Sequence, residues 1–262
     1  MFYFITNLNP IIQALLAGLF TWFVTFLGSL LIIFFKRSNK TIMDIMLSIA
    51  SGVMIAASIF SLILPAIEMA DKLKMHTLLI IISGLLSGGI IILITNKIFD
   101  KLSTNKNNSF KRCITLILSI TMHNIPEGLA IGVAFGSIIY GLDGGTILSA
   151  WLLALGIGIQ NFPEGAAVSF PLVREGFSKK KALFYGQLSG IVEPISSVLG
   201  ALIVIKIQYL LPYLLAFAAG AMIYVVIIEL IPESQRNKHH NLIAFFFLIG
   251  FSIMMILDIA LS

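Results

Sequence analysis

Eight long apolar runs constrain this chain more than any other feature of its sequence. A helix needs about 20 apolar residues to cross the hydrocarbon core of a bilayer. The runs cover residues 11–34, 43–67, 77–98, 113–139, 147–172, 182–205, 210–231 and 242–261. They are uniformly apolar and about twice as long as a membrane β-strand, which favours helices over a barrel. The sequence predicts an all-α integral membrane protein with eight transmembrane helices.

The composition agrees with a chain that lies in lipid. Hydrophobic residues make up 58% of it and charged residues only 11%, with a mean hydropathy of +1.03; soluble domains carry about a quarter charged residues. The net charge of +5 comes from basic residues in short loops. We therefore expect the bilayer, and no nucleic acid, as the partner of the positive charge. A single cysteine excludes an intrachain disulfide and a cysteine metal cluster.

The polar interruptions between the runs are too short to separate domains. We expect one transmembrane transporter domain of eight helices over residues 1–262. The first run exceeds the core of a signal peptide, so residues 11–34 are predicted to be a retained helix.

Basic residues set the predicted orientation. Of the 17 Lys and Arg residues, all but Lys72, Lys74 and Lys206 lie in the loops after the first, third, fifth and seventh runs or, for Lys97, at the very end of the third run. Cytoplasmic loops carry the excess of Lys and Arg. The pattern therefore predicts a multi-pass protein of the cytoplasmic membrane, with the N- and C-termini both outside.

Two related hexapeptides place polar residues inside the spans. The fourth run contains HNIPEG at 123–128 and the fifth contains QNFPEG at 160–165. Charge inside a span is costly and indicates function. The two helices are predicted to cross in opposite directions, and inverted repeats of this kind are typical of transporters with a site near the midplane.

The spacing within each hexapeptide brings metal-binding groups onto one helix face. On the fourth helix these are His123, Asn124 and Glu127, and on the fifth they are Gln160, Asn161 and Glu164. Imidazole and carboxylate together suit zinc and related divalent ions. Two carboxylates would balance a divalent charge in a low dielectric. The alternative for His123 is a core histidine held by hydrogen bonds. The alternative for the three amides is hydrogen bonding between helices.

Proline and glycine accompany both glutamates. Pro126 and Pro163 cannot donate to the carbonyl four residues earlier, so each is predicted to bend its helix and free that carbonyl. Gly128 and Gly165 follow the glutamates and would allow close helix approach.

Other polar residues receive weaker assignments. Glu193, before Pro194 in the sixth run, is expected to belong to the metal site. Met54 and Glu229 are accessory candidates, the first as a soft neighbour and the second at a cytoplasmic exit or in water. The following are expected to be solvated or without a role: Glu68, Glu233, His76, His239, His240 and Cys113. For the three histidines, transient metal contact is the alternative.

With these motifs in place, the chain resembles the ZIP (Zrt/Irt-like) metal transporters over nearly its whole length, most of all the prokaryotic ZupT and GufA-like branch. The residues that carry the resemblance are HNIPEG, QNFPEG, Glu193-Pro194 and ELIPES at 229–234.

The resemblance implies a metal site on the fourth and fifth helices, with two adjacent positions. His123, Glu127, Gln160 and Glu164 would form one position, with Met54 nearby; Asn124, Asn161 and Glu193 would form the second, bridged by the two glutamates. Asn161 stands where some relatives carry Asp, which lowers the negative charge for a second metal. The resemblance also implies a homodimer, and transport by movement of helices 1, 4, 5 and 6 against the others.

The resulting functional expectation is uptake of a divalent metal ion, foremost zinc, with iron, manganese, cobalt and cadmium open. No resident cofactor is expected, because the metal is cargo. The rivals are an intramembrane metalloenzyme and a coupled carrier for an organic solute. The chain lacks a His-Glu-x-x-His motif and has no aromatic or arginine cluster deep in the spans, so we expect neither.

Overall fold

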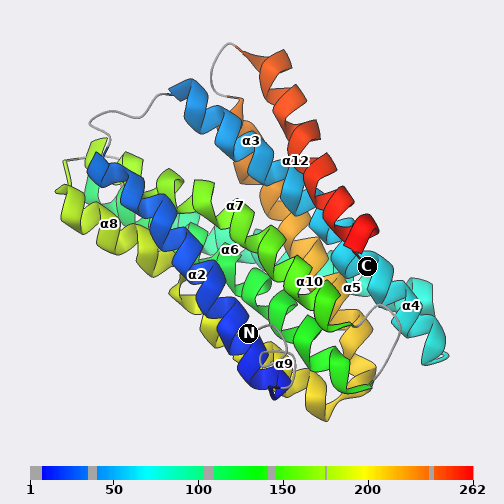
Figure 1. Cartoon of the computed structure of the whole chain (residues 1–262). Helices are drawn as coiled ribbons and strands as arrows, with labels where there is room; N and C mark the ends of the chain where they lie inside the picture. Colours follow the sequence, from blue (N-terminus) through cyan, green and yellow to red (C-terminus); the bar gives the residue numbers. More distant parts are fainter. Residues whose placement is uncertain are drawn as a thin grey trace.

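The computed structural model describes residues 8–34, 40–102, 109–140, 146–174, 176–235 and 239–261, and throughout these ranges the secondary structure is helical, without strands. Figure 1 shows the helices packed side by side as one bundle. The α-helices are α2 (Pro10–Phe34), α3 (Lys40–Ala57), α4 (Leu64–Lys72), α5 (Thr77–Leu102), α6 (Ser109–Ser137), α7 (Ile147–Arg174), α8 (Lys179–Leu188), α9 (Val192–Lys206), α10 (Leu211–Val225), α11 (Ile231–Ser234) and α12 (His240–Leu261).

The predicted spans correspond to helical segments in every case. Among the described residues, six segments are long and apolar enough to cross a membrane: Pro10–Phe34, Thr41–Lys72, Thr77–Ile98, Lys179–Lys206, Leu211–Ser234 and His240–Ala260. The all-helical membrane class is therefore confirmed. α6 and α7, the helices that contain the polar hexapeptides, are not among the six. Their crossing, the external termini and the inverted relation of these two helices remain predictions.

Three of the spans contain irregular turns that the apolar pattern did not reveal. π-helical turns occur at Ser58–Ile63, between α3 and α4, and at Val226–Leu230, between α10 and α11; a 3₁₀ turn at Ser189–Ile191 separates α8 from α9. Each precedes a proline, namely Pro65, Pro232 or Pro194. A proline ring clashes with the carbonyl four residues earlier, and a locally wider or tighter turn relieves that clash. By contrast, α6 and α7 continue past Pro126 and Pro163.

Helix pairs with glycines on both partners build the bundle. The closest pairs are α2 with α7, α6 with α9, α5 with α10, and α3 with α12. In each pair a glycine of one helix touches the backbone of the other, as with Gly132 of α6 against Ser197 and Gly200 of α9 against Leu129. Contacts of this kind let helices approach closely where lipid offers no hydrophobic driving force.

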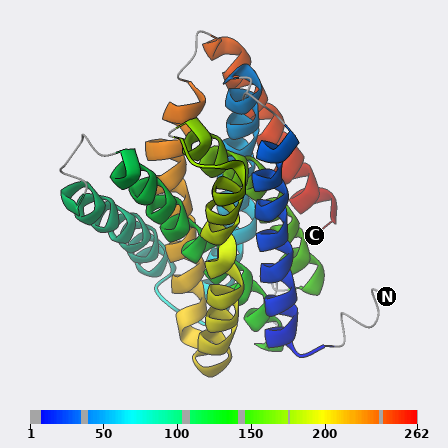
Figure 2. The same cartoon turned by 90° about the vertical axis from the view of Figure 1, so that its left-hand side faces the viewer.

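The pairs combine into two groups. α2 contacts α6, α7 and α9, whereas α5 with α10 and α3 with α12 form the other part of the bundle. In Figure 2, α5 stands at the edge of the bundle. It exposes a row of large apolar side chains suited to lipid, including Leu78, Ile82, Leu86 and Ile90.

Candidate metal site

The polar residues of α6 and α7 are buried inside the bundle. Asn124, Glu127, Gln160 and Asn161 have no exposed surface, and Glu164 is 5% exposed. Asn124 and Glu127, three residues apart, share a face of α6, and Asn161 and Glu164 repeat that spacing on α7. The two helices pack against each other. The bundle therefore encloses these polar groups on both helices.

A hydrogen bond joins the two hexapeptides directly. Gln160 Nε2 donates to Glu127 Oε1 at 2.8 Å. Because a carboxylate can only accept, the amide must turn its nitrogen toward Glu127 and leave its own oxygen facing elsewhere.

Glu193 of α9 connects to both helices. Its Oε1 accepts from Asn124 Nδ2 at 3.1 Å, and its Oε2 accepts from Asn161 Nδ2 at 2.7 Å. The carboxylate is fully buried. The first residues of the two Asn-x-x-Glu pairs are therefore held by one carboxylate from a third helix.

Several oxygen atoms in this region have no hydrogen-bond partner. Among the described side chains, the buried oxygens without a partner near the hexapeptides are Asn124 Oδ1, Glu127 Oε2, Gln160 Oε1, Asn161 Oδ1 and Glu164 Oε2. Leaving a buried polar group unpaired costs about 1–3 kcal/mol, and more when it is charged. Five such atoms lie on two neighbouring helices, and oxygen atoms are a common type of ligand for cations.

The electrostatics favour a cation as well. Glu127 lies close enough to Glu164 and Glu193 for the carboxylates to repel one another. No described Lys or Arg interacts with any of the three. Buried charges ordinarily require a partner. The described His, Cys, Asp and Glu side chains contain no group of three arranged to hold a metal.

The remaining predicted residues differ in their surroundings. The side chain of His123 lies outside the described part of α6, as does that of Cys113. Met54 of α3 is buried in the main hydrophobic cluster. Glu229, in the π-helical turn before α11, is half-buried, accepts from Asn96 Nδ2 at 3.4 Å and repels Glu164 electrostatically. Those expected to be solvated, Glu68, His76, Glu233, His239 and His240, are exposed.

Sequence reasoning missed the contribution of α2. The backbone oxygen of Thr21 accepts from Asn161 Nδ2 at 3.4 Å, and the side chains of Thr21 and Thr25 interact with Glu193. Thr21, Thr25 and Ser29 recur every four residues in an otherwise apolar run, and all are buried. That polar stripe was the available signal that this helix faces the site rather than lipid.

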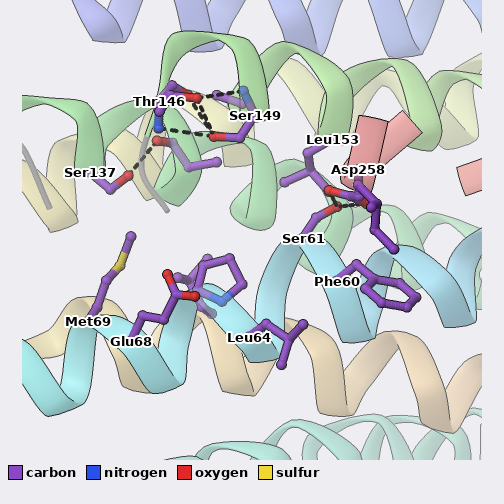
Figure 3. A pocket seen from close by; sticks show the side chains of 15 residues that line it. Phe60, Ser61, Leu64, Glu68, Met69, Ser137, Thr146, Ser149, Leu153 and Asp258 are labelled. Carbon is purple, nitrogen blue, oxygen red and sulfur yellow. Dashed lines mark hydrogen bonds between the residues drawn. The ribbon is translucent and has the colours of Figure 1, made fainter. Parts of the chain in front are cut away.

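A separate pocket lies between the two helix groups. Its volume is about 320 Å³, and it is lined by Ser61, Glu68, Ala134, Leu153 and Asp258 among others. Figure 3 shows Ser61 donating to both oxygens of Asp258, at 2.9 and 2.7 Å. None of the predicted ligands lines the pocket, but Ala134 follows Glu127 by seven residues and Leu153 precedes Gln160 by seven. The pocket is thus about 10 Å from the cluster along both helices, at 1.5 Å per residue.

Comparison with known proteins identifies the family. The family model described as "ZIP Zinc transporter" matches residues 100–258. The chain is 36% identical over 340 residues to zinc transporter ZIP11 of Homo sapiens, covering 97% of this chain and 98% of that protein. It is 32% identical over 213 residues to zinc transporter GufA of Myxococcus xanthus, covering 78% and 81%. It is 28% identical over 280 residues to zinc transporter ZupT of Clostridium perfringens, covering 95% of each.

The family-model match spans the helices that hold the buried carboxylates, and the matches to ZIP11 and ZupT extend over nearly the whole chain. They confirm the resemblance drawn from the two hexapeptides, with relatives in animals as well as in bacteria. The chain belongs to the ZIP family of zinc transporters.

Proposed function

We propose that this chain carries zinc and related divalent ions across the cytoplasmic membrane into the cell, through a site between α6 and α7. The observation that carries the proposal is the set of five buried oxygens without partners, two of which belong to the carboxylates of Glu127 and Glu164. With Glu193 these make three carboxylates that no described basic side chain neutralises. A divalent cation would satisfy both the unpaired oxygens and the charge. The relatives named as zinc transporters support zinc as the cargo.

Glu127 and Glu164 are the proposed anionic ligands, and together they balance the charge of one divalent ion. Amide oxygens from Asn124, Gln160 and Asn161 supply neutral ligands, and His123, one turn before Glu127 on α6, supplies an imidazole. A mixed set of imidazole and oxygen ligands suits zinc but accepts other first-row ions. Met54 and Glu229 remain accessory residues, with Glu229 placed to attract an ion because it already interacts with Glu164.

The pocket between the helix groups is the proposed outer vestibule. Its lining residues lie near the end of α6 and the start of α7, which the distribution of Lys and Arg assigns to the outside. An ion entering there would meet oxygens of Ser61, Glu68 and Asp258 before it loses its water. The direction of transport is then inward, toward the basic loops.

The packing supports movement of one helix group against the other. α2, α6, α7 and α9 contact one another, and they meet the second group mainly where α7 contacts α3 and where α6 contacts α10. We propose that these four helices, with α8, move together and carry the bound ion between the two sides. We also propose that the chain acts as a homodimer and as a transporter rather than an enzyme, as the family resemblance implies.

Reconstitution in liposomes tests the function. The purified protein is placed in vesicles that contain a zinc-sensitive dye, beside a Glu127→Gln, Glu164→Gln double variant that keeps side-chain size but removes both charges. The proposal predicts zinc influx in the wild type and little in the variant. Iron, manganese, cobalt and cadmium added in competition then rank the cargo. Equal influx in both proteins would exclude the proposed pathway.

A further inference from the structure

Glu193 uses both of its carboxylate oxygens within the protein. Oε1 accepts from Asn124 Nδ2 and Oε2 accepts from Asn161 Nδ2. These donors belong to different helices, α6 and α7, while Glu193 belongs to α9. Since a carboxylate has no hydrogen to donate, each asparagine next to it must present its nitrogen and not its oxygen.

Both hydrogens of each asparagine amide are occupied. Asn124 Nδ2 also donates to the Ser189 backbone oxygen at 3.2 Å, and Asn161 Nδ2 also donates to the Thr21 backbone oxygen at 3.4 Å. Ser189 begins the 3₁₀ turn that precedes α9. Rotating either amide by 180° would break two hydrogen bonds and turn its oxygen toward acceptors. The orientation of both amides is therefore fixed.

Fixing the amide nitrogens also fixes the positions of the amide oxygens. Asn124 Oδ1 and Asn161 Oδ1 are buried and have no partner. The same logic holds for Gln160, whose nitrogen is taken by Glu127 and whose Oε1 is unpaired. Carboxylates thus orient all three amides with their oxygens available, as an incoming cation requires.

We propose that Glu193 is a positioning residue that holds Asn124 and Asn161 with their oxygens toward the cargo, and that each chain binds one divalent ion. This inference rests on the proposed function. It differs from a second metal position that includes Glu193 as a ligand, because here the Glu193 oxygens accept hydrogen bonds from the two asparagines whose own oxygens are left unpaired.

The charge supports a single ion. Glu127 and Glu164 balance one divalent cation, and the negative charge of Glu193 is shared with its two amide donors, Asn124 and Asn161. Two divalent ions would leave a net positive charge among three carboxylates in a low-dielectric interior, which is costly. Asparagine at position 161 adds no charge to offset it.

Metal stoichiometry tests the proposal without any substitution. Purified wild-type protein in detergent is dialysed to equilibrium against zinc, and bound zinc per chain is measured over a range of concentrations. The proposal predicts one saturable ion per chain. Two saturable ions, of which Glu193→Gln removes one, would overturn it.

The Glu193→Gln variant tests the positioning role. The glutamine oxygen can accept a hydrogen bond from one asparagine. The glutamine nitrogen is a donor and would face the donating nitrogen of the other asparagine, so that asparagine must rotate its amide. Outer-shell substitutions of this kind weaken metal binding about 10- to 100-fold, and we expect that loss at an unchanged stoichiometry of one. Asp44→Asn is the matched control, since Asp44 is another buried carboxylate but lies near the start of α3 and not on α6, α7 or α9; it should keep wild-type affinity.

Infrared difference spectra distinguish a positioning role of Glu193 from metal ligation by Glu193. The spectra are recorded on zinc addition to protein that contains carbon-13-labelled asparagine. If Glu193 positions the amides, Glu193→Gln retains the zinc-induced carboxylate bands of the wild type but weakens the asparagine carbonyl bands. Loss of a carboxylate band would make Glu193 a ligand and contradict the proposal. In a Glu193→Gln, Asn161→Asp double variant, the side chain at position 193 can donate and the side chain at position 161 can accept. This variant should recover zinc affinity at one ion per chain.

The same binding assay distinguishes failure of the proposed metal site from failure of the positioning role of Glu193. If Glu127→Gln, Glu164→Gln binds zinc like the wild type, the proposed site is wrong. If that variant loses binding while Glu193→Gln retains wild-type affinity, the site stands and only the positioning role is refuted.

Discussion

Replacing Gly165 with alanine should disturb zinc transport by separating α2 from α7. Gly165 directly follows Glu164, and a Cβ atom added to it would overlap the Thr25 backbone oxygen and lie 2.9 Å from Ser29 N and 3.0 Å from Ser29 Oγ. Backbone atoms of a helix cannot turn away as a flexible side chain can. α2 must therefore retreat by roughly 1–2 Å to restore ordinary spacings of about 3.5–4 Å.

That retreat reaches the site through one hydrogen bond. Asn161 lies one turn before Gly165 on α7, and its bond to the Thr21 oxygen is already 3.4 Å long. A further shift of about 1–2 Å takes the pair beyond hydrogen-bonding distance. Overpacking costs about 1–3 kcal/mol and the lost bond about 1 kcal/mol, against a gain of about 1 kcal/mol from replacing a helical glycine. We expect a net loss of about 1–3 kcal/mol in the free energy of unfolding and slower zinc uptake.

The measurements are thermal unfolding in detergent and zinc influx into liposomes. Gly89→Ala on α5 is the control, because the atom nearest to the added methyl group is Tyr224 Cδ2, at an ordinary 3.5 Å. That variant should be neutral or slightly more stable and transport normally. Gly165→Ala with wild-type stability and wild-type influx would refute the link between glycine packing and the site.

Further substitutions test the ligand set and the orientation. Gln160→Leu removes the donor to Glu127 Oε1, and zinc affinity should fall about 10- to 100-fold, as measured by competition with a zinc dye. Asn161→Asp adds a carboxylate, so dialysis should detect a second zinc ion per chain; a stoichiometry of one would argue that charge does not limit occupancy. In a cysteine-free background, His76→Cys should react with an impermeant maleimide on intact cells and His239→Cys only after permeabilisation; the reverse pattern would invert the topology.

Much of the fold could be predicted because lipid imposes a simple rule. Every backbone polar group in the membrane must be satisfied internally, so a long apolar run can only be a helix. Run length therefore indicated the helical segments with their approximate ends, as for 11–34 and α2, Pro10–Phe34. The hexapeptides were also informative, because buried charge is too costly to retain without a use.

What could not be predicted depends on contacts between distant segments. The two asparagines could be interpreted as ligands or as hydrogen-bonding residues, and each is bonded to Glu193 through its nitrogen while its oxygen is unpaired. The spacing along one helix contains no information about a carboxylate on another. The π-helical turn at Ser58–Ile63 likewise depends on how the helix adjusts to Pro65, which hydropathy does not report.

The most direct test of the central claim is to locate the ion. Crystals of the wild-type protein soaked in zinc, with anomalous diffraction measured at the zinc absorption edge, should give one peak between α6 and α7, within about 2.0–2.2 Å of oxygens from Glu127 and Glu164. The peak should be absent from the Glu127→Gln, Glu164→Gln variant. A zinc peak elsewhere in the bundle, with these two carboxylates unoccupied, would contradict the account.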